Sequence, residues 1–397
     1  MKRKRGEGEL NGKKGMAGRL LAAGLLIATC LGGVTPVPAA AQPGMDCPEY
    51  FFNATDANDF FFGRTDRHFT QGLRLSLVER RFNKKRPDYD SHIKDNCTSE
   101  RLPVRISRGV AGFFTGLAHK IGEATLEKGL GFEFETASFI VGHNIYTPED
   151  LSKTGLISRD RPYAGWFYIG FGFFDENKRQ VLEWDDVSVL DSVEIDLGVI
   201  GPASGGERVQ RTWHELIDDE DPKGWHNQLH NEFALLISYD RKYRLPLWKE
   251  DGILPAGDWI PGGGVALGNV FTYVALGGIM RVGYNLPADY GPPRIRPGTQ
   301  GSDFFETGAG RDRKRLMAYL YMGLEGRAIA QNIFLDGNTF RTSHAVNKRY
   351  LVGDWQFGGA LAYDCIRLAY TQVFRSQEFK GQFEPDVFGS VTLSVRF

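Results

Sequence analysis

The residues best suited to chemistry lie in one polar segment, residues 201–230. Gln210 and His214 are four positions apart, a spacing that places two side chains next to each other on one helix face. Neutral histidine is the usual general base near pH 7, so His214 is the candidate for activating water. Ser204 followed three residues later by Glu207 is a capping-box pattern, which predicts that the helix starts there.

An acidic run, Asp218, Asp219, Glu220 and Asp221, follows the predicted helix. Negative charge at a helix C-terminus opposes the helix dipole unless a cation compensates. Carboxylate oxygens suit a hard cation such as Ca²⁺. A lone histidine in a loop helix is more often simply solvated, but the neighbouring glutamine and the acidic run favour a functional site.

A second group of polar residues lies near the mature N-terminus. Asn58 and Asp59 end the first predicted strand, and Thr70 begins the second. In a β-hairpin these strand ends would lie together at one rim. The alternative is ordinary turn chemistry, because Asn and Asp favour turns in any case.

The elements that must position these residues are strands. In residues 388–397, Val391, Leu393, Val395 and Phe397 alternate with polar residues, which predicts a strand with one apolar side. A terminal aromatic residue on such a strand resembles the signal that the barrel-assembly machinery recognises in outer-membrane proteins.

Similar alternation recurs along the chain and predicts about twelve antiparallel strands, an even number, as single-chain bacterial barrels have. We therefore expect an all-β, transmembrane outer-membrane β-barrel with a short helix in an external loop. Closure of the sheet would remove the edges that lipid cannot tolerate. The predicted strands lie near residues 50–59, 70–77, 131–144, 163–174, 189–200, 231–241, 257–266, 270–278, 316–325, 351–363, 365–376 and 388–397.

The N-terminus and the composition indicate export. Basic residues, the apolar stretch Leu20 to Leu31 and small residues before Gln42 have the order of a signal peptide, so we assign residues 1–41 to a signal peptide and 42–397 to one barrel domain. The net charge of −1 gives no indication of nucleic-acid binding. Three cysteines would remain after cleavage; Cys47 and Cys97 could pair in the periplasm, but nothing in the sequence requires it.

Three connections are too long for hairpins: residues 81–130, 201–230 and 285–315. With the N-terminus in the periplasm, 201–230 would be external, whereas 81–130 and 285–315 would face the periplasm. The insertion 81–130 contains a helix-like run from Val110 to Leu126.

Four segments resemble the outer-membrane lipid A 3-O-deacylase family, a group of calcium-dependent β-barrel enzymes. They are Ala57 to Asp59, Thr65 to Gly72, Ile145 to Arg161 and, most specifically, Asp196 to Asn231. The resemblance implies a twelve-stranded barrel whose site lies between the barrel wall and an external helix. The insertion 81–130 is not part of it.

Carried over by residue, the resemblance implies catalytic roles for His214 as base, Gln210, Asn58 and Thr70. Asp59 and Glu220 would hold Ca²⁺, which would stabilise the oxyanion. Lys153 would bind the substrate's acidic sugars, but Thr154 replaces a second basic residue of the family, which leaves headgroup recognition open. The expected activity is hydrolysis of the ester-linked 3-O acyl chain of lipid A by a monomer in the outer membrane.

Two other functions remain open at this point. A phospholipase-type esterase would need a serine beside its histidine on the barrel wall. A porin or structural barrel would use Gln210 and His214 only to line a plug. The sequence indicates neither the acyl-chain specificity nor the role of the insertion.

Overall fold

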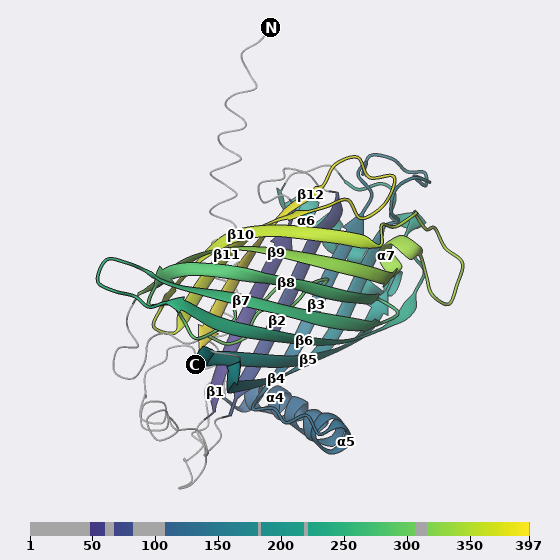
Figure 1. Cartoon of the computed structure of the whole chain (residues 1–397). Helices are drawn as coiled ribbons and strands as arrows, with labels where there is room; N and C mark the ends of the chain where they lie inside the picture. Colours follow the sequence, from purple (N-terminus) through teal and green to yellow (C-terminus); the bar gives the residue numbers. More distant parts are fainter. Residues whose placement is uncertain are drawn as a thin grey trace.

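The computed structural model describes residues 48–59, 67–81, 108–181, 184–217, 221–305 and 316–396. Its strands form one closed antiparallel barrel in which each strand pairs with its neighbours in sequence and β1 pairs with β12 (Figure 1). The prediction of a twelve-stranded barrel is therefore confirmed. The strands are β1 (Glu49–Asn58), β2 (His68–Arg80), β3 (Thr136–Thr147), β4 (Ala164–Val181), β5 (Trp184–Ile200), β6 (Glu232–Trp248), β7 (Ala256–Gly268), β8 (Phe271–Tyr284), β9 (Met317–Asn332), β10 (Leu351–Tyr363), β11 (Ile366–Arg375) and β12 (Asp386–Arg396).

Several predicted features lie outside the described residues: the signal peptide, Cys47, Cys97, Glu220, Phe397 and residues 82–107 of the insertion. The described helices are α4 (Arg108–Gly122), the π-helical turn η1 (Glu123–Glu127), α5 (Lys128–Leu130), η2 (Pro202–Ser204), α6 (Gly206–Ile217), η3 (Trp225–Asn227) and α7 (Ile333–Asp336). None of these described helices is long and apolar enough to cross a membrane.

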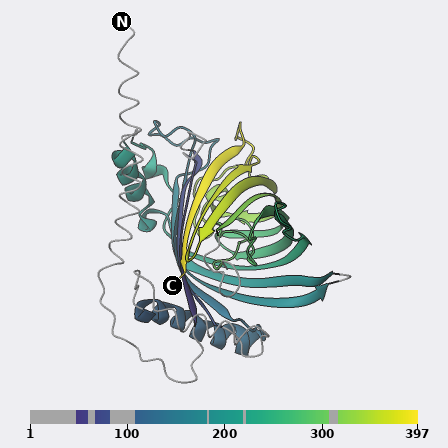
Figure 2. The same cartoon turned by 90° about the vertical axis from the view of Figure 1, so that its left-hand side faces the viewer.

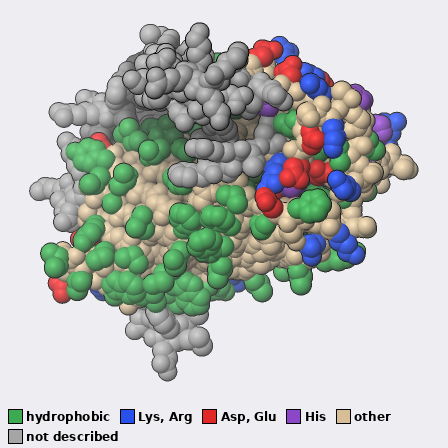
Figure 3. Space-filling model, turned by 90° about the horizontal axis from the view of Figure 1, so that it is seen from above, with side chains coloured by type: hydrophobic (Ala, Val, Ile, Leu, Met, Phe, Trp, Pro, Cys, Tyr) green, Lys and Arg blue, Asp and Glu red, His purple; other side chains and the backbone are tan. Residues whose placement is uncertain are grey.

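The alternation of side chains places apolar residues on the outside of the wall. On β8, the side chains of Val274 and Leu276 are 52% and 70% exposed. The side chain of Tyr273, the residue before Val274, is buried in the lumen. The same alternation holds on β9, where Leu320 and Leu324 point outward. Hydrophobic side chains spread over much of the visible wall, and charged ones gather toward one end (Figure 3). This outer surface is suited to acyl chains.

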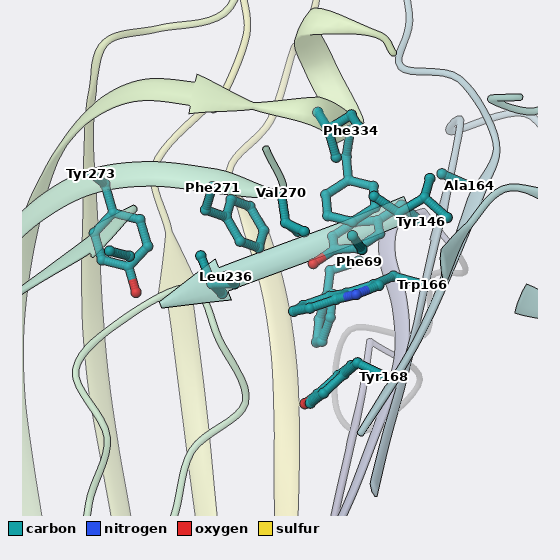
Figure 4. Packing of buried hydrophobic residues seen from close by; sticks show 14 of the residues in the cluster. Phe69, Tyr146, Ala164, Trp166, Tyr168, Leu236, Val270, Phe271, Tyr273 and Phe334 are labelled. Carbon is teal, nitrogen blue, oxygen red and sulfur yellow. The ribbon is translucent and has the colours of Figure 1, made fainter. Parts of the chain in front are cut away.

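The outer part of the lumen is filled by aromatic rings from several strands and from α7. Phe334 stacks on Tyr146 with ring centroids 3.9 Å apart, and Trp166 lies edge-on to Phe271 of the facing wall at 6.2 Å (Figure 4). Rings from elements far apart in sequence thus meet inside the barrel.

The rest of the lumen is occupied by the β8–β9 connection, which corrects the expectation that residues 285–315 face the periplasm. Its described part, 285–305, turns inward and is held by ion pairs to the wall. Arg74 contacts Asp303 at 2.8 and 2.9 Å, and Arg296 contacts Asp240 at 3.0 Å. Because inward-facing charges on the strands need partners in a low-dielectric interior, the connection is drawn inside.

Candidate active site

Helix α6 lies against the outside of the barrel wall, at the opposite end of the barrel from α4 (Figure 2). Trp166 points into the lumen, so Gly165 beside it on β4 faces outward. A Cβ atom at Gly165 would lie 3.0 Å from Gly206 Cα and 2.2 Å from Ser204 Oγ. His143 Nε2 on β3 also lies 3.1 Å from Ser204 O. The absence of a side chain at Gly165 therefore allows the start of α6 to approach the wall closely.

The predicted capping box is not formed, because the helix begins at Gly206 and is preceded by Gly205 rather than by Ser204. The Ser204 hydroxyl donates to Gly201 O at 2.6 Å, and the first helical bond runs from Val209 N to Gly205 O at 3.0 Å. Gly205 has φ of 74°, a left-handed conformation that suits glycine. The chain thus enters α6 through a glycine turn.

Gln210 and His214 are both buried, with 1% and 3% of their surface exposed. Trp225 Nε1 donates to Gln210 Oε1 at 2.7 Å, which fixes the face of α6 that carries both residues. Trp225 in turn packs with Tyr163 and with Ile145 of β3. The predicted pair is therefore enclosed between α6 and the wall. The alternative that His214 is a solvent-exposed loop residue is wrong.

Asn58, Asp59 and Thr70 come together at the adjoining ends of β1 and β2, as expected. Asn58 pairs with Gln71 in the strand register, and all three site residues are at least nine-tenths buried. The β2–β3 register shifts between Phe69 and Gln71, and the Thr70 hydroxyl lies 2.7 Å from that of Thr147. Regular pairing would place Thr70 opposite the lumen-facing Tyr146. Because of the bulge, Phe69 takes that place and Thr70 lies beside Thr147, which is a frequent use of bulges near functional sites.

The strand ends and α6 are linked through β3. Gln71 pairs with Ile145, and Ile145 belongs to the apolar cluster beneath Trp225, the residue that holds Gln210. The end of β2 that carries Thr70 therefore lies beside β3, and β3 carries Ile145, the wall residue on which Trp225 packs.

Lys153 lies in the outer loop between β3 and β4, beside the segment that follows α6. Lys223 N donates to Leu151 O at 2.9 Å, and Asn227 Nδ2 donates to Thr154 O at 2.7 Å. The side chain of Lys153 is more than half exposed and lies 3.2 Å from Asp150 Oδ2. Hydrogen bonds from Ser152 and Lys153 lower the pKa of Asp150. Lys153 is thus accessible at the rim, separate from the buried residues.

One buried polar group at the same rim received no role from the sequence. His68 Nδ1 lies 2.6 Å from Asp386 Oδ1, and its Nε2 lies 3.6 Å from Asp160. Burial raises the pKa of Asp160, but the nearby His68 ring and the N–H groups of Glu149 and Arg161 outweigh it and hold this pKa below its ordinary value. His68 is 90 or more positions away from both carboxylates in the sequence, so local sequence spacing did not indicate these pairs.

The oxygen donors at the strand ends are of the kind that a hard cation prefers. Asn58, Asp59 and Thr70 offer amide, carboxylate and hydroxyl oxygens, and Asp59 Oδ2 also accepts the Arg67 N–H at 2.5 Å. Among the described residues, no group of three or more His, Cys, Asp or Glu forms a metal site. The donor set fits calcium in chemical type, and Glu220 lies outside the described residues.

Comparison with known proteins identifies a family and solved structures of similar fold. A family model described as outer membrane protein LpxR matches residues 25–397. The solved structure of LpxR from Salmonella typhimurium superposes with a TM-score of 0.59 at 16% identity, covering 87% of this chain and 99% of that one.

Another solved outer-membrane barrel is only weakly similar. The transport unit of the autotransporter AIDA-I from Escherichia coli has a TM-score of 0.32 at 7% identity, covering 93% of this chain and 95% of that one. No curated protein matches the chain by sequence.

Proposed function

Because the chain belongs to the LpxR outer membrane protein family, we propose that it is a lipid A 3-O-deacylase of the outer membrane, with His214 as the general base. The observation that carries the proposal is the enclosure of His214 and Gln210 between α6 and the outer wall, one strand away from Asn58 and Thr70. Substrate approaching within the outer leaflet would reach this surface without entering the barrel.

The proposed reaction is attack of water on the ester carbonyl. An imidazole nitrogen of His214 accepts a proton as the water oxygen bonds to the carbonyl carbon. The same nitrogen then returns the proton to the departing 3-hydroxyl oxygen as the ester bond breaks, which leaves a free fatty acid and an alcohol. The bond from Trp225 to Gln210 holds the face of α6 that also carries His214, which would limit the movement of the base.

The cation would be held by Asp59, with Asn58 and Thr70 beside it and Glu220 from the loop after α6. When bound, Ca²⁺ would polarise the ester carbonyl and stabilise negative charge on its oxygen. The N–H of Arg67 already orients the Asp59 carboxylate. Lys153, exposed at the outer rim, would contact anionic sugar substituents of lipopolysaccharide.

The two alternative functions each meet an obstacle in the described residues. Ser204 is the serine whose backbone contacts a histidine, but its hydroxyl donates to Gly201 O, so it is not aligned as a nucleophile. A porin needs a continuous lumen, whereas residues 285–305 and the aromatic cluster fill the barrel.

The test is deacylation of lipopolysaccharide by His214→Ala, compared with His226→Ala, which changes an exposed histidine of the same loop. We expect the first variant to lose roughly two to four orders of magnitude in rate and the second to retain the wild-type rate. Undiminished deacylation by folded His214→Ala would overturn the assignment.

A further inference from the structure

Helix α4 of the insertion wraps across the outside of the barrel. Its contacts fall on four neighbouring strands: Gly112 approaches Tyr50 of β1, Thr115 donates to Glu79 of β2 at 2.6 Å, and Phe114 stacks on Phe139 of β3 at 4.7 Å. At its end, Gly122 lies against Phe173 of β4. Because the helix starts over β1, passes β2 and β3 and ends over β4, its axis crosses the strands rather than following one of them.

The contacted residues lie near the ends of these strands, at the rim opposite α6 (Figures 1 and 2). This rim carries the short turns between β4 and β5 and between β10 and β11, as well as the start of β1 and the end of β12. In bacterial outer-membrane barrels the short turns are periplasmic and the long loops extracellular. We therefore place α4 at the level of the inner leaflet.

The helix has three distinct sides. Ala111, Thr115 and Ala118 are buried against the wall. A second side is apolar but not covered: Phe113 is 69% and Leu117 42% exposed. The third side carries the exposed charge of Glu123, whereas Lys120, seven residues after Phe113 and three after Leu117, lies at the border of the apolar side. A helix that separates wall, apolar and charged sides suits the corner where a barrel, a bilayer and water meet.

The orientation of the apolar and charged sides of α4 agrees with a position where barrel, bilayer and water meet. Phe114, next to the apolar side, covers Phe139, which lies farther along β3 from the rim than the buried Ala137. On the other flank, His119 lies 3.9 Å from Glu79, and Glu123 lies 4.0 Å from Arg81 at the end of β2. The apolar side therefore faces the membrane-spanning wall, and the charged side faces the rim.

We propose that α4 is an interfacial helix that inserts into the periplasmic leaflet of the outer membrane, with phospholipid acyl chains covering Phe113 and Leu117. The occupant follows from continuity, because the exposed apolar side of α4 adjoins the lipid-facing surface formed by Phe139 and Phe171, whose rings are themselves in contact. The insertion then binds inner-leaflet phospholipid, a ligand separate from the proposed substrate in the outer leaflet.

The test measures the surroundings of single labelled positions in the full barrel. In a background with every cysteine replaced by serine, Phe113→Cys and Leu117→Cys are labelled with an environment-sensitive fluorophore, and Glu123→Cys serves as the matched control on the charged side. Each protein is placed in nanodiscs of phosphatidylethanolamine and phosphatidylglycerol with brominated acyl chains. Heat-modifiable migration on gels shows that each variant is folded.

We expect brominated lipid to quench the labels at 113 and 117 strongly, with little quenching by aqueous iodide, and the reverse pattern at 123. Iodide quenching at 113 and 117 equal to that at 123 would overturn the proposal. Self-quenching at these positions that disappears on dilution with unlabelled protein would also overturn it, because a second copy of the chain would then be covering the helix.

Discussion

Gly165→Val is the substitution that most directly perturbs the contact between α6 and the wall. The added Cβ would lie 3.0 Å from Gly206 Cα, whereas carbon atoms prefer separations of about 3.5–4.0 Å. The backbone of α6 must therefore retreat by about 0.5–1 Å for the Cβ alone, and farther for the two methyl groups of valine. A misplacement of about 1 Å can lower a rate on the order of 100-fold, so we expect at least that loss.

The matched control is Gly326→Val, an outward-facing glycine of β9 with open space around its Cβ position. Both variants should insert into membranes and show heat-modifiable migration. Deacylation is followed by mass spectrometry, and hydrogen exchange reports on residues 206–217. Faster exchange in α6 with a wild-type rate in Gly165→Val would refute the reasoning that the close contact positions His214.

Three further predictions follow from other contacts. Trp225→Phe removes the 2.7 Å hydrogen bond to Gln210 and should lower deacylation about tenfold, whereas an unchanged rate would show that this bond does not position the site. Purified protein in planar bilayers should show no steady ion conductance, because residues 285–305 fill the lumen; porin-like conductance would contradict this. Burial and the nearby Arg81 lower the pKa of His119 to about 4, so protonation favours the undocked helix as the pH falls below the ordinary pKa of 6.5. Helix α4 should therefore lose roughly 2 kcal/mol of docking stability at pH 5. Hydrogen exchange of residues 111–122 should then be faster at pH 5 than at pH 7.5.

Alternation of side chains was sufficient to predict the barrel because each strand has one side in lipid and one in the lumen. It underestimated strand length: β6 reaches Trp248 and β9 reaches Asn332, beyond the predicted ends at 241 and 325. In the β9 extension, small and polar residues continue the strand pairing with little apolar pattern, whereas in β6 the alternation of Tyr243, Leu245 and Leu247 continues past the predicted end.

The two main departures arise from contacts that spacing does not reveal. The start of α6 is set by the left-handed Gly205 and by the close approach to Gly165, a residue on another strand. The filled lumen depends on pairs such as Arg74 with Asp303, 229 positions apart. The residue type of inward-facing arginines on the strands was a usable signal, because each needs a buried partner.

The placement of the candidate residues was anticipated better than that of their neighbours, because the family resemblance supplied residues that alternation does not identify; the chemical roles of these residues stay a prediction. Gln210 and His214 are enclosed, and Asn58, Asp59 and Thr70 gather at one rim, as expected. The neighbouring pairs of His68 with Asp386 and of Arg161 with Glu378 were not predicted. They form only when the loops close over the outer end of the barrel.

The most direct test of the central claim is mass spectrometry of lipid A after incubation of lipopolysaccharide with the purified wild-type protein, with Ca²⁺ or with a chelator. The account predicts loss of one ester-linked 3-O hydroxyacyl chain in the presence of Ca²⁺ and intact lipid A with the chelator. Intact lipid A under both conditions would contradict the proposed deacylase activity, and equal deacylation under both would contradict the calcium site.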